Sequence, residues 1–234
     1  MITFFHVSKR RKKLTILDDI SFTVQAGRVS GFLGENGAGK SSSLRILLGL
    51  DRPTAGEALI DGKKYCQLKN PLRLVGSALG GAGAHPARSA RNHLTWIALS
   101  NGISLKRVDE VLSEVGLSGQ AHRKIGEFSL GMAQRLGIAA ALIGRPEILI
   151  FDEPLNGLDP EGIRWFRDLV RAHAASGGTV LLSSHVISEL EAVADDVIVI
   201  HRGRIVGAGS ISELTRGHVN LESAFFALTD GSRP

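Results

Sequence analysis

The sequence of 234 residues contains a single cysteine, Cys66. One thiol excludes an internal disulfide framework and a metal site built from several cysteines. No apolar run reaches the roughly 18 residues that a membrane span requires. The first residues, Met-Ile-Thr-Phe-Phe-His, lack the basic stretch that precedes the apolar part of a secretory signal. We therefore expect a cytosolic protein, unless a partner holds it elsewhere.

The composition is that of a globular protein, with 43% hydrophobic and 22% charged residues. At about 150 residues per domain, the length predicts one large domain or a domain with a subdomain. The net charge is +5, and five consecutive cations account for it: Lys9, Arg10, Arg11, Lys12 and Lys13. Because the basicity is local, we expect no nucleic-acid partner. The Lys9–Lys13 cluster is predicted as a solvated loop between two strands, with contact to anionic lipid or to nucleotide phosphates left open.

Periodicity and turn residues predict an α/β order. Strands are expected over residues 16–24, 29–33, 148–151, 179–182 and 197–201, and a hairpin over 58–65 around Asp61-Gly62. Helices are expected over residues 40–50, 90–99, 105–115, 130–143, 162–175 and 186–193, and a loop over 77–86. The pattern predicts a mixed α/β sheet into which a mostly helical subdomain is inserted.

The strongest motif is Gly-Glu-Asn-Gly-Ala-Gly-Lys-Ser, from Gly34 to Ser41. It matches the phosphate-loop pattern G-x-x-x-x-G-K-[ST] in full, between an expected strand and an expected helix. Glycines let the backbone wrap a phosphate, and the N–H groups at the helix start point at the anion. Lys40 adds a positive charge for the β- and γ-phosphates, and Ser41 offers a hydroxyl to Mg²⁺.

Two carboxylates follow the apolar run over residues 148–151. Asp152 and Glu153 come at the carboxyl end of this expected strand, where α/β sheets bind ligands. Asp152 could hold Mg²⁺, and Glu153 could polarise an attacking water as a general base. An acidic pair after an apolar run is common, so this prediction depends on the phosphate loop.

Two weaker signals complete the set. Ser129 precedes an expected helix as a potential N-cap, which forms an anion site but is also found in ordinary helices. His185 follows the expected strand over 179–182, where it could bond a γ-phosphate, although a lone histidine is more often structural.

Together these motifs resemble the ATP-binding cassette (ABC) ATPases, the ATP-binding subunits of ABC transporters. The resemblance covers roughly residues 1–210. It implies a phosphate-loop NTPase fold of the ABC type, with an antiparallel β subdomain, a mixed or parallel core sheet and an inserted helical subdomain. It implies one cassette over 1–220, with the helical subdomain at about 82–142. The segment 221–234 would form a short C-terminal helix and tail, as in drug- and peptide-exporter ATPases.

The resemblance also implies a site and a cycle. ATP would bind to Gly34, Glu35, Asn36, Gly37, Ala38, Gly39, Lys40, Ser41 and Ser42. Mg²⁺ would bind to Ser41 and Asp152, and Glu153, His185 and Lys40 would be catalytic. The signature, Ser129-Leu130-Gly131-Met132, would bind the γ-phosphate held by a second ATP-binding subunit, identical or related. Asp159 would also lie at that head-to-tail interface. Hydrolysis would open the dimer and drive a separate membrane permease, on the cytoplasmic face of the membrane, for export.

Two positions depart from the family pattern. Arg11 stands where an aromatic residue usually stacks on adenine, and an arginine plane can stack there instead. Gly80 stands at about the position of the glutamine or glutamate of the Q-loop, so a contact to Mg²⁺ or water would be missing.

Three other functions stay open, and the two departures favour the first of them. The chain could be a degenerate cassette that binds nucleotide beside an active partner. It could be a non-transport ABC ATPase acting on ribosomes or DNA, although it shows no broad basic surface. A small-molecule kinase is a further phosphate-loop alternative, but Ser129 and His185 have no role in one.

Overall fold

The computed structural model describes residues 1–80 and 83–230. The chain forms two compact units, the first comprising Met1–Lys69 and Arg171–Pro234 and the second Asn70–Val170. The expected start of the helical subdomain near residue 82 and the last four residues of the expected tail lie outside the described residues. The division into a cassette and a tail stays a prediction.

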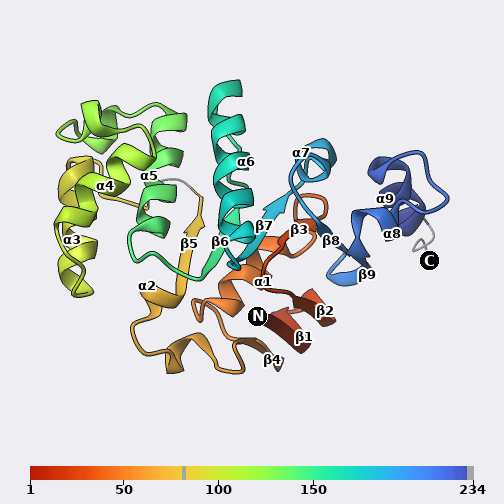
Figure 1. The fold of residues 1–234 in the computed structure, drawn as a ribbon. Helices are drawn as coiled ribbons and strands as arrows, with labels where there is room; N and C mark the ends of the chain where they lie inside the picture. The colour runs from red at the N-terminus through yellow and green to blue at the C-terminus, as the bar shows by residue number, and fades with distance from the viewer. Residues whose placement is uncertain (81–82, 231–234) are drawn as a thin grey trace. The chain divides into compact units, whose positions relative to one another are not determined.

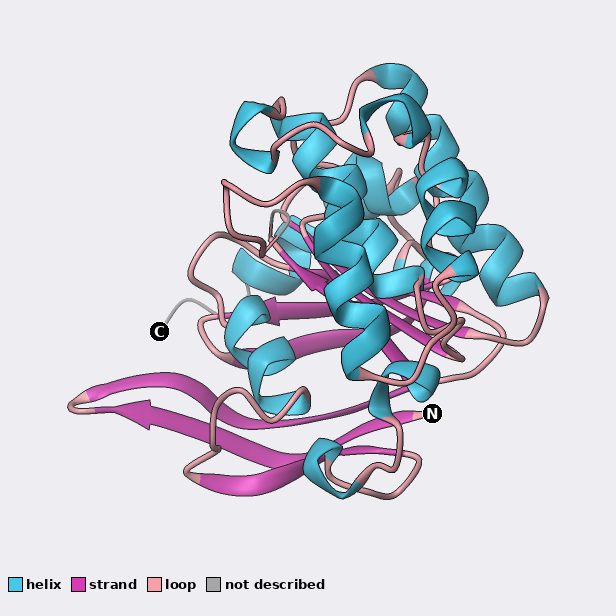
Figure 2. Ribbon diagram, turned by 90° about the vertical axis from the view of Figure 1, so that its left-hand side faces the viewer, coloured by secondary structure: helices cyan, strands magenta, loops and turns pink. Residues whose placement is uncertain are grey.

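An antiparallel sheet of three strands opens the first unit. Its order is β2 (Leu14–Val24), β1 (Ile2–Arg11) and β4 (Ala55–Ile60). These strands form a long twisted ribbon that begins at the N-terminus (Figure 2). On its buried face Phe4 stacks on Phe22 with ring centroids 4.4 Å apart, and Phe22 in turn lies 5.3 Å from Phe32 of β3.

A second group of strands in the first unit is mostly parallel. β3 (Val29–Leu33) is parallel to both β7 (Thr179–Ser184) and β8 (Asp196–His201), and β9 (Arg204–Ser210) is antiparallel to β8. Every residue of β3 and of β7 is buried, which is typical of parallel strands covered on both faces. The expected strands over 29–33, 179–182 and 197–201 are confirmed.

Short helices follow these strands. They are α1 (Lys40–Leu47), α7 (Ile187–Glu191), α8 (Ile211–Leu214) and α9 (Leu221–Asp230), with a 3₁₀ turn over Tyr65–Gln67. α8 begins with a capping box, in which the Ser210 hydroxyl accepts from the Glu213 N–H at 3.2 Å and the Glu213 carboxylate accepts from the Ser210 N–H at 2.9 Å. α9 occupies the segment where a closing helix is expected.

The second unit is mostly helical. Its helices are α2 (Pro71–Leu74), α3 (Ala90–Ser100), α4 (Lys106–Glu114), α5 (Leu130–Leu142) and most of α6 (Pro160–Ala175), with 3₁₀ turns over Ser118–Gln120 and Ile125–Glu127. Its strands, β5 (Val75–Leu79) and β6 (Ile148–Asp152), are parallel. α3, α4 and α5 pack against one another, in yellow to green in Figure 1.

Three expectations differ from the structure. The hairpin over 58–65 is confirmed only at its turn, because a single antiparallel bridge, Ile60 to Lys63, closes Asp61-Gly62 and β4 otherwise pairs with β1. The loop over 77–86 begins too early, because residues 77–79 belong to β5.

The Lys9–Lys13 cluster is also not simply a loop. Lys9, Arg10 and Arg11 end β1, and only Lys12 and Lys13 form the turn to β2. The ammonium of Lys9 bonds the Asp51 carboxylate at 2.5 Å and the Arg52 carbonyl oxygen at 2.6 Å. This hydrogen bond from Lys9 lowers the pKa of Asp51 below its usual value.

The backbones of β5 and α5 pack closely in the second unit, and this packing allows a prediction about stability. A Cβ at Gly76 would lie 2.0 Å from the Ala141 carbonyl oxygen, so Gly76→Ala must displace backbone. We expect a loss of about 1–3 kcal/mol in the free energy of unfolding, measured by urea denaturation. The matched control is Gly119→Ala, because a Cβ there meets nothing within 4 Å. Equal stability of the two variants would contradict this packing argument.

Candidate functional site

The loop from Gly34 to Gly39 follows β3 and can exist only with glycine at its two ends. A Cβ at Gly34 would lie 2.4 Å from the Ile200 carbonyl oxygen. Gly39 has φ +116°, and a Cβ there would lie 2.5 Å from the Leu17 side chain. The loop is therefore packed on its inner side against β2 and β8, while Glu35, Asn36 and Gly37 are exposed.

The loop leads into the N-terminus of α1. Gly39 is its N-cap residue and supplies no side-chain acceptor for the N–H groups of the first turn. In any α-helix these N–H groups lack acceptors within the helix, and the helix dipole favours an anion there. Ser41 is exposed in this first turn.

Lys40 lies inside the loop. It is 5% exposed, and its ammonium donates to the Gly34 carbonyl oxygen at 2.6 Å and to the Glu35 carbonyl oxygen at 3.3 Å. These contacts hold a positive charge beside the N-terminus of α1. The loop, Lys40 and Ser41 thus have the chemistry of a phosphate cradle, as the motif predicts.

His185 lies at the same edge as this loop. In the parallel pair, Leu33 of β3 is opposite Ser184 of β7, so Gly34 and His185 both follow paired residues. Adjacent strands lie about 4.8 Å apart. The Ser184 hydroxyl accepts from the Val186 N–H at 3.0 Å and donates to Glu189 at 2.8 Å, which fixes the turn that carries the exposed His185.

Arg11 is exposed at the end of β1, opposite Leu14. Leu14 lies two residues, or about 7 Å, along β2 from Ile16, and a Cβ at Gly39 would lie 3.2 Å from the Ile16 carbonyl oxygen. In the first unit, the phosphate loop therefore lies near both His185 and the part of β2 that follows its pairing with Arg11.

The second unit gathers the two carboxylates and Gly80. Leu79 of β5 is opposite Asp152 of β6, so Gly80 and Glu153 follow paired residues at one edge. Glu153 has φ +50°, in the left-handed region that a non-glycine residue rarely adopts. Such backbone strain is typical of functional sites, where it aims a side chain. Gly80 has φ +83°, and a Cβ there would meet nothing within 4 Å.

Ser129 caps α5 as expected, accepting from the Met132 N–H at 3.2 Å. The first turn of α5 packs against the Asn156-Gly157-Leu158 segment, because a Cβ at Gly131 would lie 2.7 Å from the Gly157 carbonyl oxygen. Leu130 lies in the first turn of α5 beside Gly157, and it is 64% exposed. The signature and the segment before Asp159 therefore form one continuous surface of the second unit.

Asp159 is held by two contacts within the second unit. It accepts from the Gly162 N–H at 2.9 Å, at the start of α6, and lies 3.9 Å from the Arg135 guanidinium. Arg135 also stacks on Trp165 at 4.8 Å and donates to the Val115 carbonyl oxygen at 3.1 Å. Sequence analysis assigned no role to Arg135 or Trp165, because their contacts join residues from separate parts of the chain.

The predicted site residues thus fall into two sets, one in each unit.

Among residues 1–80 and 83–230, no group of three or more histidine, cysteine, aspartate or glutamate residues could hold a metal. None of the helices in the described part of the chain has the length and apolarity needed to cross a bilayer.

Comparison with known proteins identifies relatives over most of the chain. Residues 17–156 match the family described as ABC transporter. The chain is 44% identical over 193 residues to the bacitracin transport ATP-binding protein BcrA of Bacillus licheniformis, a match that covers 81% of this chain and 63% of that protein. It is 36% identical to the lantibiotic transport ATP-binding protein SrtF of Streptococcus pyogenes, with 96% of each chain covered. The chain therefore spans less than two thirds of the Bacillus licheniformis relative.

Solved structures share the fold. An ATP-binding subunit of an ABC transporter superposes with a TM-score of 0.88 at 25% identity, covering 97% of this chain and 99% of that chain. A dimeric bacterial ABC transporter cassette superposes with a TM-score of 0.82 at 24% identity, covering 90% of this chain and 98% of that chain.

The geometry of Gly39 makes a prediction for nucleotide binding. Gly39→Ala introduces both a forbidden φ and a clash with Leu17, so the start of α1 must shift. We expect ATP affinity to fall at least about tenfold, as 1.4 kcal/mol of lost binding free energy would produce, measured by equilibrium titration. The control is Gly62→Ala, which has φ +74° but meets nothing within 4 Å. Unchanged ATP affinity in Gly39→Ala would contradict the assignment of this loop.

Proposed function

The chain is an ATP-binding cassette of the ABC transporter family, and from this premise we propose that it is the ATPase subunit of a transporter whose membrane permease is a separate chain. The observation that carries the proposal is the phosphate cradle, in which Lys40 and the uncapped start of α1 face one edge of the sheet beside His185.

ATP binds with its β- and γ-phosphates on the loop from Gly34 to Ser42. The N–H groups of the loop and of α1 donate to phosphate oxygens, and Lys40 neutralises their charge. Arg11 stacks on the adenine from the end of β1, where its exposed guanidinium plane replaces the usual aromatic ring. Ser41 and Asp152 would hold Mg²⁺, which neutralises charge on the phosphates.

Glu153 is the general base. Its strained backbone directs the carboxylate from the end of β6, so that it accepts a proton from the attacking water. His185 bonds the γ-phosphate from the turn after β7.

The signature binds the nucleotide that a second cassette holds. Ser129 and the N–H of Gly131 contact the γ-phosphate that the other subunit's Lys40 holds, and Asp159 lies at the same head-to-tail interface. Loss of the γ-phosphate removes these bridging contacts and opens the dimer. The second cassette is another copy of this chain or a related subunit.

The transported substrate class follows from the relatives. Two of them are named for transport of bacitracin and of a lantibiotic. We propose export of an antibiotic of this kind, with the cassette on the cytoplasmic face of the membrane through its permease.

Gly80 supports a second candidate, a degenerate cassette that binds ATP but depends on a sister subunit for hydrolysis. The family has a glutamine or glutamate side chain at the Q-loop position. Gly80 stands there in this chain, at the edge that also carries Glu153, and it has no side chain. Robust steady-state turnover by the purified chain alone would exclude this candidate.

The test of the main proposal is Glu153→Gln. This change keeps the shape of the side chain but removes the base, so we expect the rate of ATP hydrolysis to fall by at least about 100-fold. ATP should stay bound, and a dimer should form on its addition, as judged by light scattering after gel filtration. The matched control is Glu222→Gln, in the first turn of α9, which should hydrolyse ATP at the wild-type rate. Normal turnover in Glu153→Gln would refute the assigned mechanism.

A further inference from the structure

A second concave site lies in the second unit, and none of its lining residues belongs to the phosphate loop. It is a cavity of about 490 Å³, within the range of small-molecule sites. α2, the start of α4 and the segment after α5 form its walls. Four cations and one acid line it: Arg73, Lys106, Arg107, Arg145 and Glu110.

Close backbone contacts build this cavity. A Cβ at Gly144 would lie 1.8 Å from the Leu72 carbonyl oxygen, so only glycine lets α2 approach the end of α5 and place Arg73 at the cavity wall. Arg145 follows with φ +49°, and its N–H donates to the Leu142 carbonyl oxygen at 3.0 Å. A non-glycine residue in this strained conformation brings a guanidinium to the cavity wall.

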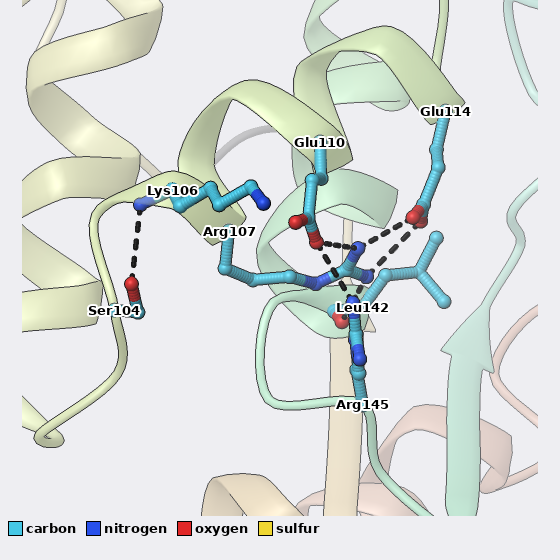
Figure 3. Close-up of polar contacts among 7 residues, drawn as sticks. All are labelled: Ser104, Lys106, Arg107, Glu110, Glu114, Leu142 and Arg145. Carbon is cyan, nitrogen blue, oxygen red and sulfur yellow. Dashed lines mark hydrogen bonds and ion pairs between the residues drawn. The ribbon is translucent and has the colours of Figure 1, made fainter.

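The Arg107 side chain is held in place at the cavity wall by several hydrogen bonds. It is 9% exposed, and its terminal nitrogens donate to Glu114 at 2.5 and 3.0 Å and to the Leu142 carbonyl oxygen at 3.0 Å. Glu110 accepts from Arg145 at 2.8 Å and lies 3.4 Å from Arg107 (Figure 3). The hydrogen bond from Arg145 lowers the pKa of Glu110 below its usual value.

The cavity keeps an excess of positive charge after these pairs are counted. Glu110 and Glu114 compensate Arg107 and Arg145. Neither the ammonium of Lys106 nor the guanidinium of Arg73 makes a hydrogen bond or an ion pair within residues 1–80 and 83–230. Two uncompensated cations therefore line one cavity from different helices, α2 and α4.

The remaining walls are partly apolar. Ile103 and Ile143 contribute carbon surface, and Ser104 contributes a hydroxyl near the start of α4. The α4 N-terminus adds the positive end of its dipole. A ligand that fits has a doubly charged group for Lys106 and Arg73 and a carbon portion for the two isoleucines.

We propose that this cavity binds a phosphate monoester, with Lys106 and Arg73 as the contacts to the phosphate. A phosphate dianion offers three terminal oxygens and two negative charges, which match the two uncompensated cations that line the cavity. The ester comes either from a soluble phosphorylated metabolite or from a lipid headgroup, which present the same group.

The test uses glycerol 3-phosphate as the probe and calorimetric titration as the measurement. Lys40→Ala is the background in every protein, because it weakens phosphate binding at the phosphate loop. In that background we expect saturable binding that weakens at least about tenfold in the double variant Lys106→Ala, Arg73→Ala. The matched control is Lys124→Ala, Arg164→Ala, which removes an exposed lysine and arginine of the same unit and should bind as the background does.

The outcomes separate the possibilities. Absence of saturable binding in the background, or equal affinity in the double variant and the background, overturns the proposal. Thermal unfolding of each variant shows whether any loss comes from misfolding, since both changed side chains are exposed and should leave the melting temperature near that of the background. If loss of binding coincides with a lowered melting temperature, the single variant Lys106→Gln must still lose affinity, or the proposal fails.

The source of the ester is decided with vesicles that contain 20% phosphatidic acid, a probe composition chosen to present the same monoester. Cosedimentation that depends on Lys106 and Arg73 identifies a lipid headgroup. Binding of glycerol 3-phosphate without such cosedimentation identifies a soluble ester. Both results support the cavity as a monoester site.

Discussion

The central constraint is the close approach of backbone to backbone around the turn from β3 to α1. Gly34 packs on the Ile200 carbonyl oxygen and Gly39 on Leu17, so no side chain can occupy the inner wall of the loop. The helix begins without a side-chain cap, and Lys40 is held by loop carbonyl oxygens instead of projecting into solvent. An uncapped helix start and a buried ammonium are costly alone, and a bound phosphate satisfies both.

The same principle organises the second unit. Gly131 lets the capped start of α5 lie on the Gly157 carbonyl oxygen, so the signature and the Asp159 segment form one surface. Asp159 in turn starts α6 and neighbours Arg135, which stacks on Trp165. This linkage gives a physical route by which a γ-phosphate at the signature could influence α6. At the other end of α5, Gly144 and Arg145 shape a separate cationic cavity.

The sequence predicts the elements whose pattern is local. The buried strands β3, β6 and β7 are continuous apolar runs, and the phosphate loop has a fixed spacing of glycines, so both could be found without a structure. β1 was expected without bounds, because bulges break its alternation, and β5 was missed, because Gly76 weakens its apolar run. The hairpin at Asp61-Gly62 ends at its turn, because a turn signal does not reveal that β4 pairs with β1. The strain at Glu153 and the contacts of Arg135 depend on tertiary packing, which no local pattern encodes.

The most direct test of the central claim follows backbone amide resonances during titration with a non-hydrolysable ATP analogue. The account predicts that the largest shifts occur over residues 36–42, where the loop and the first turn of α1 would donate to phosphate, and that Lys40→Ala suppresses them. Largest shifts outside the loop, or shifts over 36–42 that persist unchanged in Lys40→Ala, would contradict it.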